Sequence, residues 1–196
     1  MNTNPLSFYD DFRTTGQSDA IRLGWRSHDQ QQANFVGVLS LIEKRLSLKG
    51  LSVHDAGCGH GDVIPHLQSR EIGSYVGTDA MNIPITIARK RHESHDFRRM
   101  DLLVETVPKA DVTLCIGSLA FYPTQPATRL ISRLWHATDR ALAFSMWWEL
   151  TPEFLLWRDA NKTKAFLVAL AQREARAFEV IEPAVVGGEA YVVLHR

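Results

Sequence analysis

Short apolar segments with strand character alternate with helical segments along the chain from residue 51 onward. Such alternation is typical of a largely parallel sheet, because each connection between parallel strands needs room for a crossover helix. The loop between the last two strand segments, 178–181 and 190–194, is too short for such a helix, so these two should pair antiparallel. The pattern therefore predicts an α/β fold: a doubly wound, mostly parallel seven-stranded sheet with a C-terminal antiparallel hairpin.

A strong helix signal precedes the first strand. Ser27, with Gln30 three residues later, has the pattern of a capping box. Apolar residues follow at helical spacing, and we expect Gly50 to end this helix. The other expected strands are approximately 51–55, 74–78, 97–100, 111–116 and 141–147, and the expected helices between strands are approximately 62–70, 84–92, 125–136 and 151–173.

Length and composition narrow the class of protein. The 196 residues fit one domain, and 45% apolar with 22% charged residues is ordinary for a folded chain. A formal net charge of zero argues against binding nucleic acid through overall charge. No apolar run approaches the roughly 18 residues of a membrane span, and the start lacks a secretory signal pattern, so a cytoplasmic protein is expected. Two cysteines make neither a disulfide framework nor a structural zinc site, and no metal is expected.

A glycine-rich turn follows the first strand, where residues 53–62 read Val-His-Asp-Ala-Gly-Cys-Gly-His-Gly-Asp. Glycines at alternate positions allow a sharp turn and a close approach of a ligand to the backbone. Asp55 and Asp62 flank the turn and would repel a diphosphate but attract an ammonium or sulfonium group. Asp79 ends the second strand, where a carboxylate can accept hydrogen bonds from two ribose hydroxyls. The turn therefore favours a nucleoside with a cationic side chain.

These residues resemble the motifs of class I S-adenosylmethionine-dependent methyltransferases, over about residues 51–196. The stretch from Asp55 to Gly61 is similar to the first motif, and Asp79 matches the acid of the second. Asp101 matches the acid after strand three, and residues 115–119 lie at the end of strand four like the fourth motif. The resemblance implies a Rossmann-like domain at 51–196 that binds S-adenosyl-L-methionine and releases S-adenosyl-L-homocysteine.

The resemblance also implies roles for single positions. The backbone from Gly57 to Gly59 would lie against the methionine part of the cofactor, whose amino group Asp55 would help to hold. Asp79 would bind the ribose hydroxyls, and Asp101 would accept a hydrogen bond from the adenine amino group. The complete cofactor-binding set expected from the sequence is Tyr9, Trp25, Arg26, Asp55, Ala56, Gly57, Cys58, Gly59, Asp79, Ala80, Met81, Asp101, Leu102, Ile116, Gly117 and Ser118.

Residues 1–50 are expected to form an N-terminal helical lid or extension. Residues 1–28 carry several aromatic rings without a periodic apolar pattern, so they would gain burial by packing over the cofactor. Further rings follow strands four and five, and an aromatic enclosure attracts cations and excludes water. For any single ring, ordinary core packing remains an open alternative. The candidate catalytic residues around this enclosure are Tyr122, His28 and Trp148.

The expected function is an S-adenosylmethionine-dependent methyltransferase that acts on a small molecule through in-line transfer to an O, N or C nucleophile. After strand four the chain reads Gly117-Ser118-Leu119-Ala120, without the prolines typical of relatives that methylate exocyclic amines of DNA bases. A nucleic-acid partner is therefore not expected. The lack of a long apolar run also argues against a membrane partner, and the chain should be a monomer or homodimer. Two alternatives stay open: a non-methylating use of the cofactor, such as cyclisation with release of methylthioadenosine, and a non-catalytic cofactor-binding subunit.

Overall fold

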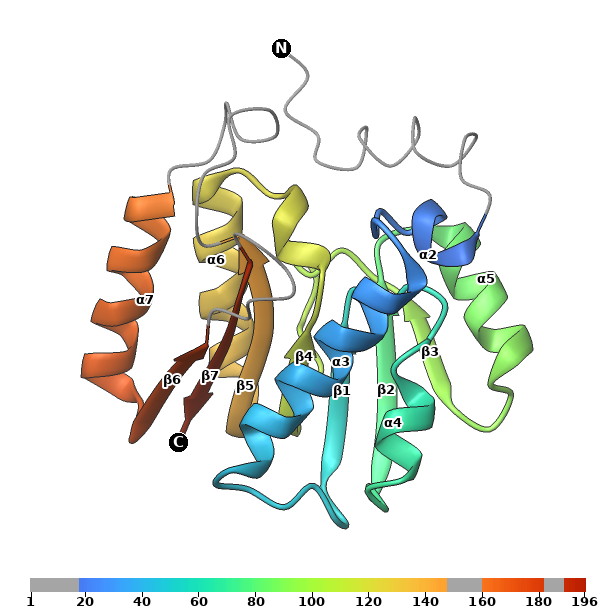
Figure 1. Cartoon of the computed structure of the whole chain (residues 1–196), viewed down its shortest axis with the longest axis horizontal. Helices are drawn as coiled ribbons and strands as arrows, with labels where there is room; N and C mark the ends of the chain where they lie inside the picture. Colours follow the sequence, from blue (N-terminus) through green and yellow to red (C-terminus); the bar gives the residue numbers. More distant parts are fainter. Residues whose placement is uncertain (1–17, 148–159, 182–188) are drawn as a thin grey trace.

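The computed structural model describes residues 18–147, 160–181 and 189–196 (Figure 1). Within these ranges, helices and strands follow one another in the expected alternating order. The strands are β1 (Ser52–Ala56), β2 (Ser74–Asp79), β3 (Asp96–Arg99), β4 (Ala110–Cys115), β5 (Thr138–Trp147), β6 (Ala177–Ile181) and β7 (Glu189–His195). The helices are α2 (Asp19–Arg22), α3 (His28–Glu43), α4 (Ile64–Gln68), α5 (Asn82–Arg91), the 3-10 helix η1 (Ser118–Phe121), α6 (Thr124–His136) and α7 (Ala160–Glu174).

All seven of these strands form one sheet, in the order β3-β2-β1-β4-β5-β7-β6. The neighbouring pairs from β3 to β5 are parallel. β7 is antiparallel to both β5 and β6, so the last two strands form a hairpin at one side of the sheet. The doubly wound fold with an antiparallel C-terminal hairpin is confirmed.

Helices cover both faces of the sheet, so its central strands β1 and β4 are almost wholly buried. Side chains alternate along each strand, so Ala143 of β5 lies in the core under α3 while Phe144 lies in the core under α6. Figure 1 shows α3 and α4 in front of the sheet and α6 behind it. The front core includes Val38, Leu39, Ile42, Ile64, Leu67 and Ile85, and the rear core includes Leu130, Ile131, Leu134, Trp135, Leu167 and Leu170.

The N-terminus of α3 confirms the predicted cap, with one difference. The Ser27 side chain accepts a hydrogen bond from Gln30 N at 3.1 Å, as a capping box requires. The Gln30 side chain reaches back one residue further than expected, because its Oε1 accepts from Arg26 N at 2.8 Å. Gln30 therefore ties the segment before the helix to its first turn.

Helix lengths differ from the sequence-based expectation at several ends. α3 ends at Glu43, so the expectation that Gly50 ends this helix was wrong. Gly50 instead shapes a turn: its φ is +74°, its N–H donates to Glu71 O at 2.9 Å, and its carbonyl lies close against Gly73. The helix expected at 62–70 is only the short α4. No helix in the described ranges is long and apolar enough to cross a membrane.

The two cysteines lie on neighbouring elements but in different cores. Cys58 follows β1 and belongs to the front core, whereas Cys115 ends β4 and belongs to the rear core. Both are buried and free. Burial raises the pKa of each thiol, so neither has the low pKa of a reactive nucleophile.

The contact between α3 and β7 gives a stability prediction for Gly37. A Cβ at this position would lie 2.1 Å from Cε2 of Tyr191, whose ring is buried and has little room to move. Alanine favours the helix by about 1 kcal/mol, but overpacking a core typically costs ~1–3 kcal/mol. We therefore expect Gly37→Ala to lower the free energy of unfolding in urea titrations.

Ser40→Ala is the matched control, because Ser40 is exposed on the same helix. We expect this variant to equal or slightly exceed the stability of the wild type, since it gains helix propensity without meeting a ring. A Gly37→Ala protein as stable as Ser40→Ala would show that α3 and β7 are not packed this closely.

Candidate functional site

The carboxyl ends of β1 and β4 meet where the winding of the sheet changes face. β1 pairs with β2 on one side and β4 on the other. The helix after β1 packs into the front core and α6, after β4, packs into the rear core. Ligands of open α/β sheets bind in the crevice beyond such a pair of strand ends. The glycine-rich turn after β1 therefore lies at the place where a ligand is expected.

The glycine-rich turn is held against the ends of β2 and β4. The N–H groups of Gly57 and Cys58 both donate to Thr78 O, at 2.7 and 2.9 Å. Ser118 Oγ donates to Gly57 O at 3.2 Å. Gly57 has a φ of +81°, and a Cβ there would lie 1.9 Å from Ser118 Oγ. Only glycine fits at this point, where two strand ends touch.

Asp79, at the end of β2, lies beside the turn. Its Oδ2 accepts from Gly59 N at 3.1 Å and its Oδ1 accepts from Met81 N at 2.8 Å. These two backbone donors hold the carboxylate in one orientation. A carboxylate offers about four lone-pair sites in all, so Asp79 is a strong acceptor group at this edge. Ala80 lies between Asp79 and Met81 in the same turn.

The end of β3 brings Asp101 and Leu102 to the same edge of the sheet. Met100 N donates to Asp79 O at 2.8 Å, which joins the ends of β2 and β3. Asp101 is partly buried, and its Oδ1 accepts the N–H of the residue two positions further on at 2.9 Å. Leu102 is buried, and its carbonyl accepts from Arg133 Nε at 2.7 Å. The two predicted adenine-side residues thus follow β3 and lie beside the end of β2.

Gly117 ends β4 in a second left-handed turn, after the buried Ile116. Its φ is +85°, and its N–H donates to Ser145 Oγ at 2.9 Å. A Cβ on Gly117 would lie 2.5 Å from Cζ2 of Trp25. The indole of Trp25 therefore lies directly against the end of β4.

The segment between α2 and α3 lies over both glycine turns. Leu23 faces Gly59, where a Cβ would lie 2.9 Å from Leu23 Cδ1. Trp25 faces Gly117 and also meets Phe35 of α3 edge to face, with ring centroids 6.1 Å apart. Trp25 was expected at the site, whereas Leu23 was not selected, because nothing in its sequence pattern marks it as a contact.

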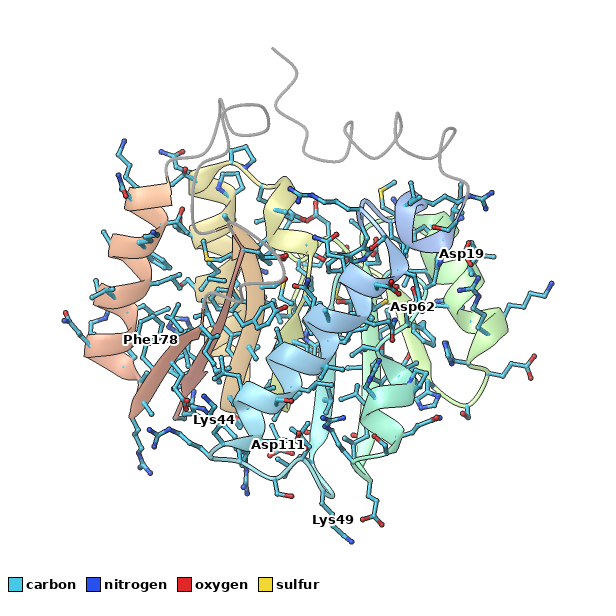
Figure 2. All side chains as sticks on the ribbon, viewed as in Figure 1. Asp19, Lys44, Lys49, Asp62, Asp111 and Phe178 are labelled. Carbon is cyan, nitrogen blue, oxygen red and sulfur yellow. The ribbon has the colours of Figure 1, made fainter. Side chains whose placement is uncertain are left out.

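Ion pairs hold α2 beside the glycine-rich turn. Arg91, at the end of α5, pairs with Asp19 of α2 and lies 3.5 Å from an oxygen of Asp62. Gln31 Nε2 donates to the other Asp62 oxygen at 3.1 Å. Figure 2 labels Asp19 and Asp62, which lie in the same upper right part of the molecule. The hydrogen bond from Arg91 lowers the pKa of Asp19, so this carboxylate is charged in its pair.

Asp55, at the end of β1, is a buried carboxyl group. Burial raises its pKa from 3.8 to about 7; a hydrogen bond from Tyr75 opposes this rise, and the charges of Asp79 and Asp62 add to it. Tyr75 Oη donates to Asp55 Oδ2 at 2.9 Å. Near neutral pH the protonated and the charged forms of Asp55 are therefore both populated. A cationic ligand beside Asp55 would favour the charged form.

Tyr122 lies on the Asp79 and Asp101 side of the edge. Burial raises its pKa above the ordinary value of 10, and the nearby Cys115, Asp101 and Asp79 add to the rise. The hydroxyl therefore keeps its proton at neutral pH and can donate a hydrogen bond. The catalytic role expected for Tyr122 stays a prediction.

The remaining predicted residues differ in how the structure places them. His28 is exposed as the first residue of α3. Arg26 is exposed, and its charge acts on Glu189 of β7. Ala56 and Cys58 are buried beside the glycine turn. Tyr9 and Trp148 lie outside the described residues.

The structure places one more buried carboxylate at this edge, which the sequence pattern did not indicate. Glu189 begins β7 opposite Trp147 and is only 4% exposed. Burial raises its pKa, while hydrogen bonds from Ser145, Asn34 and Gln30 and the charge of Arg26 lower it. In the sequence, Glu189 precedes an apolar run and looks like a loop residue. Its burial arises from α3, which is distant along the chain.

The edge carries carboxylates rather than a metal centre. Within the described ranges, no group of three or more His, Cys, Asp and Glu side chains is arranged to hold a metal ion. Asp55, Asp62 and Asp79 gather around the glycine turn, and the charges of the other two contribute to the raised pKa of Asp55. This arrangement suits a ligand that combines ribose hydroxyls with a cationic group.

The order of the strands, the antiparallel hairpin and the position of the glycine turn define the class I S-adenosylmethionine-dependent methyltransferase fold. No family model and no curated protein matches this sequence. Several solved structures share the fold.

The chain is similar to the magnesium protoporphyrin IX methyltransferase ChlM from Synechocystis PCC 6803, crystallised with bound SAH. Its identity to that protein is 21%, over 98% of this chain and 99% of that one, with a TM-score of 0.71. It is also similar to DhpI in its SAH complex, with 18% identity, 98% and 94% coverage and a TM-score of 0.70. A SAM-dependent methyltransferase from Leishmania major is 10% identical, with 98% and 82% coverage and a TM-score of 0.74.

The raised pKa of Asp55 gives a prediction for stability against pH. The folded state retains a proton that the unfolded state loses near pH 3.8, so the stability contributed by this group is full below that pH. It is lost as the pH rises through about 7. Asp55→Asn keeps the side-chain shape without the charge. We expect the wild type to lose up to about 4 kcal/mol relative to Asp55→Asn between pH 4 and 8, at ~1.36 kcal/mol per pKa unit.

Urea titrations across this pH range measure the difference, with Asp111→Asn as control. Hydrogen bonds from Ser52 lower the pKa of Asp111, so its contribution does not change between pH 5 and 8. Parallel stability curves for the wild type and Asp55→Asn would contradict the buried protonation of Asp55.

Proposed function

We propose that this protein is an S-adenosylmethionine-dependent methyltransferase that acts on a small molecule. The observation that carries the proposal is the meeting of Asp79 with the glycine turn at the point where β1 and β4 diverge. The two oxygens of Asp79 are oriented by Gly59 N and Met81 N, and the carboxylate would accept the ribose hydroxyls. The similar structures of ChlM and DhpI, which hold SAM or SAH, support this reading of the fold.

The residues at the edge fit this cofactor. Asp79 would bind the ribose hydroxyls, and Asp101 and Leu102 would face the adenine. The backbone of Gly57 to Gly59 offers close approach to the methionine part, and Asp55 would hold its ammonium group. Trp25, against Gly117, would border the sulfonium side. The binding of a cation beside Asp55 would stabilise the charged carboxylate.

When bound, S-adenosylmethionine supplies an electrophilic methyl group on a positively charged sulfur. The contribution of this chain is to orient and to exclude water. Gly117 and Ser118 hold the end of β4 close to Gly57, so the backbone there is a rigid wall. Leu23 and Trp25 cover the turns and keep water from the acceptor nucleophile, which would otherwise be solvated and less reactive. Such positioning can supply most of the rate enhancement of a transfer reaction.

A small acceptor is favoured by the carboxylates of Asp55, Asp62 and Asp79 around the glycine turn. These carboxylates would repel the phosphates of a nucleic acid. ChlM, by its name, methylates magnesium protoporphyrin IX, and it resembles this chain over nearly the whole length of both. We therefore propose that the acceptor is a compact organic molecule. This proposal does not specify a porphyrin.

Turnover with pools of small-molecule acceptors tests the function. We expect release of S-adenosylhomocysteine that depends on one pool and not on protein alone. Release of methylthioadenosine without an acceptor would instead indicate cyclisation. Binding of S-adenosylhomocysteine without turnover in any pool would indicate a cofactor-binding subunit.

The role of Asp79 predicts a loss of cofactor affinity in Asp79→Ala. Two charge-assisted hydrogen bonds to the ribose would be lost, each worth about 1.5–3 kcal/mol. We expect S-adenosylhomocysteine to bind at least tenfold more weakly in calorimetric titrations. Asp96→Ala is the control, because Asp96 is the first residue of β3, lies beside Val76 rather than at the carboxyl edge, and pairs with Arg98. Equal affinity of wild type and Asp79→Ala would exclude the ribose role.

We further propose that the N-terminal residues act as a lid. Leu23 and Trp25 lie on the glycines that would face the cofactor, so a bound cofactor should hold this segment in place. Arg22 and Arg26 are exposed and provide trypsin sites within it. We expect S-adenosylhomocysteine to slow cleavage there several-fold while leaving cleavage at the exposed Lys49, at the other edge, unchanged. A protein lacking residues 1–26 that folds and still turns over would rule out the lid.

A further inference from the structure

Glu189 is a buried acid at the edge where the proposed reaction takes place. It is paired with Trp147, the last residue of β5, so it lies beyond the carboxyl ends of the parallel strands. Two residues further along β7, Tyr191 packs its ring against Gly37 of α3, which places Glu189 on the face that α3 covers. A carboxylate in this position is costly unless its oxygens are hydrogen-bonded.

Ser145 connects Glu189 to the end of β4. The Ser145 hydroxyl accepts the N–H of Gly117 at 2.9 Å. Ser145 pairs with Tyr191, two residues along from the pair of Trp147 with Glu189, so Ser145 and Glu189 are diagonal neighbours on one face of the sheet, where the hydroxyl lowers the pKa of the carboxyl group. A hydroxyl has one proton, and since Ser145 accepts from Gly117 N–H, it can donate that proton to Glu189. The carboxylate thereby orients the serine that holds the left-handed turn at Gly117.

Gln30 connects the same carboxylate to the N-terminal segment. Its Oε1 accepts from Arg26 N at 2.8 Å, and its backbone carbonyl accepts from Asn34 Nδ2 at 3.0 Å. Asn34, fully buried one turn later, donates to Glu189 Oε2 at 3.3 Å. The residue before Arg26 is Trp25, whose indole lies on Gly117. Glu189 is therefore linked to the Gly117 turn on one side and to the Trp25 segment on the other. Since the indole of Trp25 lies on Gly117, these links form a closed ring.

We propose that Glu189 is a positioning residue of this site: its carboxylate sets the Gly117 turn and the Trp25 segment in one fixed relation. The inference rests on the proposed function, because these two elements would border the sulfonium side of the cofactor. An apolar residue at position 189 would fill the space at lower cost, since burial of a charge is seldom favourable for stability alone. The carboxylate accepts from Asn34 of α3 and lies beside Ser145 of β5, and an apolar group could accept from neither.

Two substitutions separate this role from simple packing. Glu189→Leu removes every acceptor, whereas Glu189→Gln keeps the shape and one acceptor oxygen. Trp25 is the reporter: the chain has five tryptophans, and 5-fluorotryptophan labelling with a Trp25→Phe variant assigns its ¹⁹F resonance. We expect Glu189→Leu to move this resonance towards the solvent position and to weaken S-adenosylhomocysteine binding at least tenfold. Glu189→Gln should restore affinity to within about threefold of wild type.

Internal controls distinguish local repositioning from loss of the fold. Trp135 is fully buried in the rear core, so its resonance should stay unchanged in both variants. Glu179→Gln removes another acid of the same hairpin, which pairs with Arg45, and should leave Trp25 and affinity unchanged. If Glu189→Leu does not fold, Ser145→Ala opens the same ring. It should accelerate hydrogen exchange at the Gly117 amide and weaken S-adenosylhomocysteine at least tenfold.

The outcomes separate this inference from the proposed function. Binding of S-adenosylhomocysteine to the wild type, with unchanged affinity and Trp25 resonance in Glu189→Leu or Ser145→Ala, would overturn the positioning role and leave the function standing. If the wild type fails to bind S-adenosylhomocysteine, the proposed function is overturned. A Trp25 resonance that still moves in Glu189→Leu would then show that the link between Glu189 and the Trp25 segment exists all the same.

Discussion

The close approach of the backbones after β1 and β4 is the constraint on which the rest of this edge depends. Ser118 Oγ bonds to Gly57 O, and Thr78 O holds the two amides that follow β1, so three strand ends share one small volume. A side chain at Gly57 or Gly117 would displace Ser118 or Trp25. Left-handed glycines are therefore required, because a residue without a Cβ is the one that allows these close approaches.

The site handles two buried acids in different ways. Asp55 has one side-chain donor, Tyr75, and burial raises its pKa to about 7, so it is poised to lose its proton beside a cation. Glu189 accepts from several side chains and lies near the charge of Arg26, which offsets part of its burial. The first is suited to meeting a charged ligand, and the second to holding neighbouring groups in place.

Much of the fold, and the positions of the glycines and acids at the carboxyl edge, followed from sequence patterns, because these depend on neighbours along the chain. The alternation of strand and helix, the Ser27 cap and the spacing of Gly57 and Asp79 are local signals, and the structure agrees with them. The expectation that Gly50 ends a helix was wrong for the same reason. A glycine that ends a helix and a glycine in a turn have the same local sequence pattern, and the contacts with Gly73 and Glu71 show that Gly50 shapes a turn.

By itself the sequence determined the class of fold, the order of its elements and the acids and glycines that mark the carboxyl edge, since these depend on periodicity and on short-range backbone geometry. Tertiary structure alone decided which of these groups are buried and what they touch. Leu23 and Trp25 reach Gly59 and Gly117, and Glu189 reaches Asn34 across 155 positions of the chain. Such contacts arise only when α3 packs on the sheet, because side chains distant in sequence meet through packing and not through local pattern.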